Sequence, residues 1–309
     1  MLDTRLDALE DWLEAFFSDA NFVISKASDD ASFRRYFRIE RDNASFIAMD
    51  APPEKEDCQA FVDIAKLLIA HQVHAPKIVG ENLAQGFLLL EDLGDTTLLA
   101  QLQQQLDLGL YQRAIDALID LQAIKQAEVP SYDAKRLQDE LSLLLDWYLP
   151  KTLDTQTSRA LQQLFDVLID NALKSPQVLV HRDYHSRNLM VLPEDELGVI
   201  DFQDAVIGAD TYDLVSLLKD AYLELSHTDR GQLLEYYYQQ AKVQTPWAQF
   251  ERQFDLMGLQ RHLKVLGIFK RLSVRDGKHQ YLDDIPLVRR YALQTAEKYS
   301  ECSILLEVL

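Results

Sequence analysis

The sequence contains only two cysteines, Cys58 and Cys302, and they stand far apart. Two isolated cysteines cannot supply a disulfide framework, and they lack the paired spacing of a structural zinc site. Such cysteine usage is typical of proteins in a reducing compartment. We therefore expect a cytoplasmic protein without disulfide bonds.

Positive charge is also scarce. The chain has 31 lysines and arginines against 50 aspartates and glutamates, which gives a formal net charge of -19 and a pI near 4.7. This composition offers no basic field to gather the phosphates of DNA or RNA, so we expect no nucleic-acid partner. Any small anionic ligand must instead be met by local cations or by a metal ion.

Long apolar runs are missing as well. No run approaches the roughly 18 residues that a membrane-spanning helix needs. The first residues do not resemble a signal peptide, because acidic residues occur throughout and leucines recur at helical spacing, at Leu2, Leu6, Leu9 and Leu13. We expect no membrane partner, and no feature of the sequence indicates an obligate protein partner.

The segment 1–94 has the pattern of a small mixed β-sheet with helices. After an opening amphipathic helix come short runs that are rich in aromatic and β-branched residues and bounded by turn residues. The expected strands are 33–39, 45–49, 77–79 and 87–90, and a second helix is expected over 54–71. The sequence changes character at 91–94, which we interpret as a hinge.

The segment 95–309 consists mostly of leucine-rich stretches with helical periodicity. One β-like island interrupts them, with strands expected at 178–180, 189–192 and 199–200. The predicted fold class is therefore α+β, with a small sheet lobe at 1–94 and a large helical lobe at 95–309. A short hinge between two such lobes is the layout of protein kinase-like folds.

The β-like island carries the sequence H-R-D-Y-H-S-R-N at 181–188. Phosphoryl transfer from ATP needs a carboxylate beside the attacking hydroxyl, and Asp183 has the position of that base. Arg187 is the most plausible helper, as a cation near the transferring phosphoryl group. The alternative interpretation is that these residues only form the turn of an ordinary hairpin.

Two further residues have the spacing and chemistry of metal ligands. Asn188 lies five residues after Asp183, and Asp201 follows the hairpin in the sequence I-D-F. Amide and carboxylate oxygens suit Mg²⁺, which bridges the phosphates of ATP in kinases. The motif thus predicts an enzyme that uses ATP and Mg²⁺.

The parts that grip phosphate in protein kinases are absent. No G-x-G-x-x-G loop occurs, and the corresponding residues read S-D-D-A-S-F-R; Met49 stands where the phosphate-pairing lysine would fall. We expect Ser32, Arg34 and Arg35 to contact ATP instead, with Glu56 as a possible partner of an arginine. Neighbouring strand residues face opposite sides, so at least one of the two arginines is expected to be an exposed strand residue.

These motifs resemble those of aminoglycoside phosphotransferase-like kinases, and most closely those of the N-acetylmuramate/N-acetylglucosamine kinase group. The supporting stretches are A-S-F-R-R-Y-F-R (31–38), I-A-M-D-A-P-P (47–53), L-E-D-L-G-D (90–95), I-D-F-Q-D-A (200–205) and Y-D-L (212–214). The resemblance implies a two-lobed protein kinase-like fold with adenine held at the hinge by Glu91 and Leu93. It also implies phosphorylation of the anomeric hydroxyl of an amino sugar, and hence cell-wall sugar recycling.

The acceptor of the phosphate is expected to be small. The A-P-E ending of a protein-kinase activation segment is missing, and a helix begins soon after Asp201. We expect Asp204, Asp220 and Arg261 to contact the substrate. Either Arg261 or Lys264 could meet a carboxylate such as the lactyl group of N-acetylmuramate. The alternative for Arg261 and its neighbour Lys264 is a solvated basic helix face.

Other functions stay open at this stage. The acceptor could instead be an aminoglycoside, choline or homoserine. Aminoglycosides and choline are cations, and the acidic composition would suit them too, so charge does not identify the acceptor. A catalytically inactive nucleotide-binding module is a further alternative, although such a module would have no chemical need for Asp183, Asn188 and Asp201 together. Asp213 is expected to be structural and to tie the start of its helix to the motif loop.

Overall fold

The computed structural model describes residues 3–28, 33–125 and 127–309. The chain divides into two compact units. Unit 1 comprises Met1–Thr96 and Met190–Asp204, and unit 2 comprises Thr97–Leu189 and Ala205–Leu309. The segment 190–204 thus groups with the N-terminal residues rather than with the helices. The lobe limits 1–94 and 95–309 stay a prediction.

Unit 1 is built on a five-stranded sheet with the order β1-β2-β3-β5-β4. Its strands are β1 (Val23–Ser28), β2 (Arg35–Arg41), β3 (Ala44–Asp50), β4 (Ile78–Asn82) and β5 (Phe87–Glu91). The sheet, expected as mixed, is antiparallel at every pairing. The antiparallel pairing of β2 with β3 follows from a tight turn, in which Asp42 and Asn43 join the two strands with φ angles of 50° and 63°.

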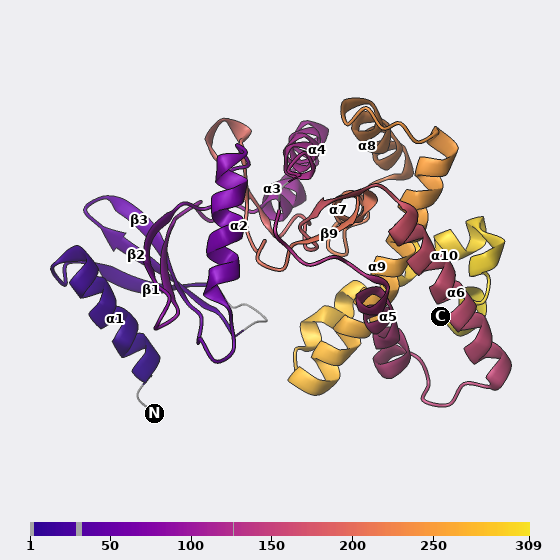
Figure 1. Cartoon of the computed structure of the whole chain (residues 1–309), viewed down its shortest axis with the longest axis horizontal. Coiled ribbons are helices and arrows are strands. Elements are labelled where there is room, and N and C mark those ends of the chain that lie inside the picture. Colours follow the sequence, from indigo (N-terminus) through magenta and orange to yellow (C-terminus); the bar gives the residue numbers. More distant parts are fainter. Residues whose placement is uncertain (1–2, 29–32, 126) are drawn as a thin grey trace. The chain divides into compact units, whose positions relative to one another are not determined.

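Two helices accompany this sheet, α1 (Thr4–Phe17) and α2 (Cys58–Ala70). Figure 1 shows them on either side of the strands. Leu9 and Leu13 of α1 pack on apolar side chains of the sheet, among them Ile39 and Phe87. The fully buried Asp50 of β3 accepts hydrogen bonds from Arg5 and Arg35, which ties α1 to two strands.

Unit 2 is mostly helical. Its helices are α3 (Leu98–Gln104), α4 (Leu108–Gln122), α5 (Ala134–Leu143), α6 (Thr155–Lys174), α7 (Thr211–Leu218), α8 (His227–Gln240), α9 (Trp247–Asp276), α10 (Ile285–Lys298) and α11 (Leu305–Val308). Many of them begin at a side-chain cap, because Asp107, Asp133, Asp154 and Ser226 each accept a hydrogen bond from a first-turn N–H. No helix in the described part of the chain is long and apolar enough to cross a membrane.

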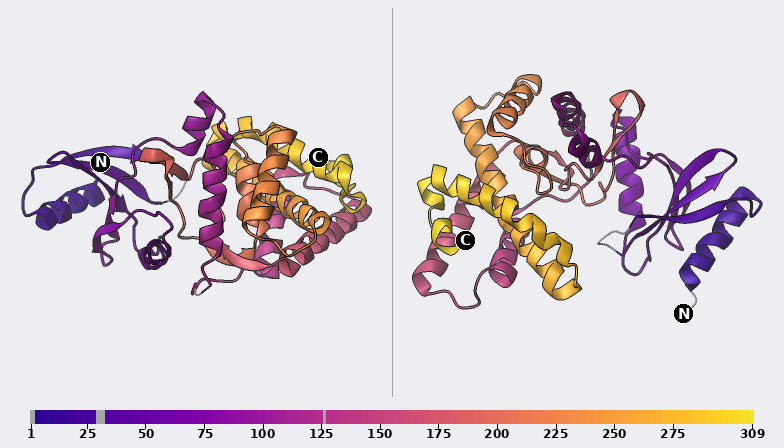
Figure 2. Two further views of the ribbon diagram at one scale, coloured as in Figure 1. Left: turned by 90° about the horizontal axis from the view of Figure 1, so that it is seen from above. Right: turned by 180° about the vertical axis from the view of Figure 1, so that it is seen from behind.

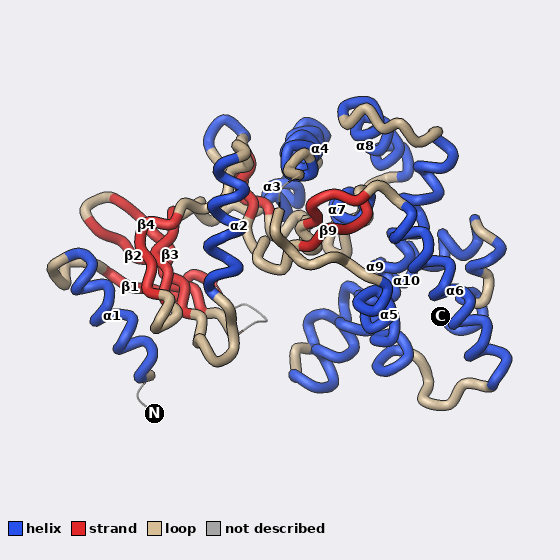
Figure 3. Tube along the Cα trace, in the orientation of Figure 1, coloured by secondary structure: helices blue, strands red, loops and turns tan. Residues whose placement is uncertain are grey.

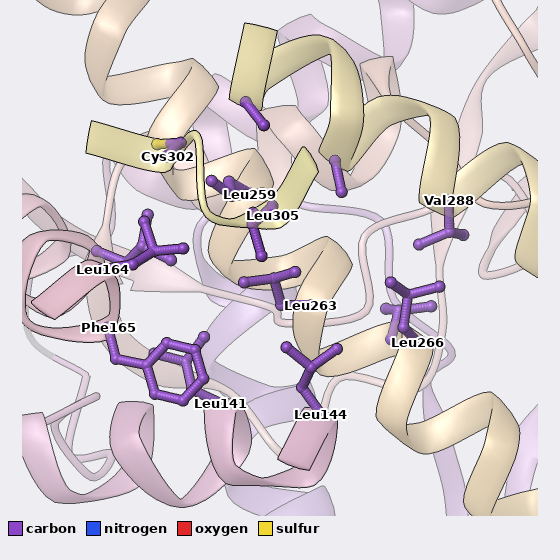
Figure 4. Close-up of a cluster of buried hydrophobic side chains, with 14 of the residues drawn as sticks. Leu141, Leu144, Leu164, Phe165, Leu259, Leu263, Leu266, Val288, Cys302 and Leu305 are labelled. Atoms are coloured by element: carbon purple, nitrogen blue, oxygen red, sulfur yellow. The ribbon is translucent and has the colours of Figure 1, made fainter. Parts of the chain in front are cut away.

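The core of unit 2 forms around α9. In both views of Figure 2 this long orange helix lies among the other helices of the unit. Leu259, Leu263 and Leu266 of α9 pack against Leu141 and Leu144, as Figure 4 shows. Every residue from 253 to 267 is buried, so the polar residues of this stretch lie inside the protein.

Two short ladders hold the motif segments. β6 (Gln177–Val180) pairs antiparallel with β9 (Val206–Ala209), and β7 (Leu189–Val191) pairs with β8 (Leu197–Val199). Figure 3 shows the strands of these ladders in red. The loop 181–188 therefore connects β6 to β7, as the sequence predicted.

Asp210, just before α7, should make stability depend on pH. It is buried, its Oδ1 has no hydrogen-bond partner, and burial raises its pKa to about 7. A pKa above that of the unfolded chain contributes stability that is present at low pH and is lost as the pH rises through about 7. We expect Asp210→Asn to gain about 1–3 kcal/mol relative to the wild type between pH 5 and pH 8.

Urea unfolding of both proteins at pH 5 and pH 8 measures this difference. Asp139→Asn, at an exposed position of α5, is the matched control and should change equally little at both pH values. A difference between Asp210→Asn and the wild type that does not depend on pH would contradict the prediction.

Candidate active site

The backbone of the loop 181–188 is anchored by Asp213 in the first turn of α7. The Asp213 carboxylate is fully buried and accepts hydrogen bonds from the N–H groups of His181, at 2.6 Å, and Arg182, at 3.0 Å. Burial raises the pKa of Asp213 to about 7, although the two N–H donors oppose that shift. Arg182 has a φ of 78°, an uncommon conformation for a residue with a side chain, and these bonds help to hold it. The predicted tie between helix and loop is confirmed.

Within the loop, the predicted base and one predicted metal ligand share a backbone group. The carbonyl oxygen of Asp183 accepts hydrogen bonds from the His185 N–H and from Nδ2 of Asn188, both at 3.0 Å. The bond from Asn188 uses the NH₂ end of its amide, so a metal ion would take the oxygen end. The described residues contain no group of three or more His, Cys, Asp or Glu arranged around a metal position.

Asp183 is set up to be ionised. Burial raises its pKa, but the positive fields of Lys264, Arg182 and Arg261 outweigh burial, and the net shift is downward. A carboxylate that stays charged at neutral pH is able to accept or orient the proton of an attacking hydroxyl.

Two of these cations, Arg182 and Lys264, are held by a network centred on Glu140 of α5. Its carboxylate lies 2.7 Å from Nη2 of Arg182 and 3.2 Å from Nζ of Lys264, and it accepts the hydroxyl of Tyr132. Nζ of Lys264 also donates to the Tyr212 hydroxyl at 3.0 Å. The solvated-face alternative for α9 is therefore wrong, because Lys264 and Arg261 are both buried.

The other side of the loop is held by the segment 220–222, which follows α7. The Asp220 carboxylate is fully buried and accepts hydrogen bonds from the N–H and Oγ of Ser186 and from the N–H of Tyr222. The Tyr222 ring lies 3.5 Å from the guanidinium carbon of Arg187 and edge-on to His185. Three successive loop residues thus contact one short segment. Substrate binding by Asp220 stays a prediction, and its observed contacts favour a role in positioning the loop.

Removal of the hydrogen bond from Ser186 Oγ to Asp220 should lower turnover. We expect Ser186→Ala to lower kcat about ten- to a hundredfold, because the loop between Asp183 and Asn188 loses a buried bond and small misplacements of reacting groups are costly. Ser216→Ala is the matched control, since Ser216 is also buried and donates only to a backbone carbonyl of its own helix. Steady-state kinetics at several Mg²⁺ concentrations checks this. Equal effects of the two substitutions would contradict a positioning role.

The remaining predicted metal ligand, Asp201, belongs to unit 1. It follows β8 with a φ of 64°, and its Oδ1 accepts a hydrogen bond from Gln203 at 2.7 Å. Its neighbour Phe202 is buried against Phe61 of α2, with ring centroids 4.7 Å apart, which anchors the segment within unit 1. Asp204 is exposed. The roles of Asp201 and Asp204 stay predictions.

The two predicted phosphate-binding arginines differ in their partners. Arg34 pairs with Glu56 at 2.7 Å, as the sequence suggested, and both side chains are mostly buried. Arg35 instead joins the ion pairs of Asp50 and Asp3. The expectation of an exposed strand arginine is wrong, because Arg34 precedes β2 and both arginines are partly buried by their ion pairs. Only Arg34 lies outside the cluster of Asp50 and Asp3. The predicted contact residue Ser32 lies outside the described residues.

The predicted hinge is fixed by Asp92, whose importance the sequence did not reveal. Asp92 accepts hydrogen bonds from Arg38, at 2.7 Å, and from Ser45. Burial raises its pKa, but these donors outweigh burial and lower it. Its neighbour Glu91 ends β5 and pairs with Lys77, and Leu93 lies against Gly198 of β8, where a side chain would collide with it.

Comparison with known proteins identifies the family. Residues 23–250 match the phosphotransferase enzyme family APH. The chain belongs to this family. It is 42% identical over 315 residues to the N-acetylmuramate/N-acetylglucosamine kinase of Pseudomonas aeruginosa, covering 95% of this chain and 92% of that protein. It is 38% identical to the protein of the same name from Neisseria meningitidis serogroup B, over 97% and 94% of the two chains. The predicted resemblance is confirmed.

Solved structures show the fold. The choline kinase LicA from Streptococcus pneumoniae matches with a TM-score of 0.70 at 11% identity, over 96% of this chain and all of that one. The ADP-bound aminoglycoside phosphotransferase APH(2'')-Ib matches with a TM-score of 0.63 at 15% identity, over 95% and 99%. These matches confirm the predicted fold class. The family match and the curated relatives, rather than the fold, support a kinase of small molecules.

Proposed function

We propose that this chain transfers the γ-phosphate of ATP to the anomeric hydroxyl of N-acetylmuramate or N-acetylglucosamine, as a step of cell-wall sugar recycling. The observation that carries the proposal is the position of Asp183 in a loop whose backbone is bonded to two buried carboxylates, those of Asp213 and Asp220. Neighbouring cations also lower the pKa of Asp183. The names of relatives at 38–42% identity support the choice of sugar. We propose a nucleotide-binding lobe at 1–94 and a catalytic, sugar-binding lobe at 95–309.

The proposed chemistry divides among few residues. Asp183 accepts or orients the proton of the sugar hydroxyl while the hydroxyl attacks the γ-phosphorus in line. The bond from the γ-phosphorus to the bridging oxygen breaks, and ADP leaves. Asn188 and Asp201 would hold Mg²⁺, because amide and carboxylate oxygens suit this ion. The metal, when bound, neutralises charge on the phosphates. Arg187, whose guanidinium is stacked on Tyr222, adds a cation for the transferring group.

A panel of acceptors tests the function. ADP formation would be measured with amino sugars, aminoglycosides, choline and homoserine. We expect turnover with the N-acetylated amino sugars and little with the others. Turnover with choline or an aminoglycoside, and none with the sugars, would replace the proposed acceptor. Stabilisation by ATP without ADP formation from any compound would favour the inactive-module alternative.

Nucleotide binding is proposed to use Arg34 together with the backbone of Glu91 and Leu93. Arg34, just before β2, is paired with Glu56, just before α2. In protein kinases the phosphate-binding lysine of a strand is likewise paired with a glutamate of a helix. We expect Arg34→Gln to raise KM for ATP about tenfold or more. Arg41→Gln, on β2 with exposed acidic partners, is the control and should leave KM unchanged. Arg35→Gln should mainly lower stability, and a normal KM for ATP in Arg34→Gln would refute the role.

A further inference from the structure

Arg261 of α9 is a buried cation without a partner. Its residue exposure is 4%, and its Nη1 is sealed from solvent without a hydrogen-bond acceptor. Within the described part of the chain, its side chain forms no hydrogen bond and no ion pair. A guanidinium has five N–H donors and never loses its charge in proteins, so burying it unpaired is costly.

Other cations inside unit 2 have carboxylate partners. Arg182 and Lys264 share the carboxylate of Glu140, and Lys219 lies 2.9 Å from Asp255. Removal of one partner from a buried ion pair typically costs several kcal/mol. An unpaired buried charge is therefore expected where a ligand brings the counterion. The partner of Arg261 is therefore expected to be an anion that the described part of the chain does not supply.

The position of Arg261 in α9 indicates where that anion would bind. Arg261 and Lys264 are three residues apart on α9, so they lie on the same face of the helix. Lys264 reaches Glu140, which holds Arg182 next to Asp183. The field of Arg261 also acts on Asp183, His185 and Tyr222. Like Arg261, His185 has a buried nitrogen without a hydrogen-bond partner, its Nδ1. Arg261 is thus placed on the side of the loop 181–188 where the sugar that accepts the phosphate is proposed to bind.

We propose that Arg261 binds the lactyl carboxylate of N-acetylmuramate and makes the enzyme favour this sugar over N-acetylglucosamine, which lacks that group. This inference rests on the proposed function. A planar guanidinium binds a carboxylate through two parallel hydrogen bonds, which a lysine cannot reproduce. Lys264 is a poorer candidate because Glu140 and Tyr212 already engage its ammonium group. In a chain with a net charge of -19, a local cation is what an anionic sugar needs.

The test compares two sugars within each variant. The measured quantity is kcat/KM for N-acetylmuramate divided by kcat/KM for N-acetylglucosamine, in the wild type, Arg261→Gln, Arg261→Lys and the control Arg275→Gln. We expect the ratio to fall about a hundredfold in Arg261→Gln and less in Arg261→Lys. It should not change in Arg275→Gln, because Arg275 lies on the same helix but is exposed and paired with Asp276.

A second measurement does not depend on the folding of any variant. The wild type is expected to lose about a hundredfold in kcat/KM when the lactyl carboxylate of N-acetylmuramate is converted to its neutral amide. An unchanged ratio in Arg261→Gln, or equal losses for both sugars, would overturn the inference, since a structural or ATP-phosphate role affects the two sugars alike. Wild-type turnover of the acid and the amide at equal rates would overturn it too. Absence of wild-type turnover with either sugar would instead overturn the proposed function.

Discussion

Replacing Asp183 with asparagine is expected to lower kcat about 10²- to 10⁴-fold, the range that a positioned general base contributes. The amide keeps the shape of the side chain but neither holds a negative charge nor takes a proton. The loop should keep its structure, because His185 and Asn188 bond the backbone carbonyl of Asp183 and not its carboxylate. Steady-state kinetics with titration calorimetry of ATP binding measures both effects, and ATP affinity should change little.

The control for this substitution is Asp170→Asn, at an exposed position of α6. Because the cations around Asp183 lower its pKa, protonation of this residue should not limit the wild-type rate until the pH falls below the ordinary range of aspartate. A kcat for Asp183→Asn within a few-fold of the wild type would remove Asp183 from the chemistry.

Replacing Glu140 with leucine is expected to destabilise the protein by about 3–5 kcal/mol, because the buried Lys264 and the mostly buried Arg182 lose their carboxylate. Arg182 and Lys264 would be left inside the protein, and the first of them is adjacent to Asp183. Turnover should therefore fall as well. Urea unfolding followed by fluorescence gives the free energy of unfolding.

Two variants qualify this result. Glu140→Gln keeps the shape and one acceptor oxygen, so its loss of stability should lie between those of the wild type and Glu140→Leu. Asp139→Asn, the neighbouring exposed acid on α5, should stay within about 0.5 kcal/mol of the wild type. A change below about 1 kcal/mol in Glu140→Leu would mean that the network does not support the loop.

The sequence predicted the parts of the site that are local in the chain. The spacing from Asp183 to Asn188, the strands around them and the anchoring role of Asp213 follow from short motifs and turn chemistry. The pairing of Arg34 with Glu56 could also be predicted, since both positions flank secondary-structure elements of one small unit.

What the sequence could not predict depends on distant contacts. Glu140 and Lys264 meet across more than a hundred residues, and no local pattern marks either as a partner of the loop. The burial of Arg261 has the same cause, because α9 is covered on all sides between 253 and 267. Strand β1 was missed because Val23 is exposed and V-I-S-K-A-S shows no clear apolar alternation.

The most direct measurement is the identification of the product by phosphorus NMR after incubation with Mg²⁺-ATP and N-acetylmuramate. We expect one sugar phosphate whose phosphorus couples to the anomeric proton, formed in a one-to-one ratio with ADP and absent with Asp183→Asn. ADP formed without any sugar phosphate, or phosphate attached at another hydroxyl, would contradict the proposed reaction.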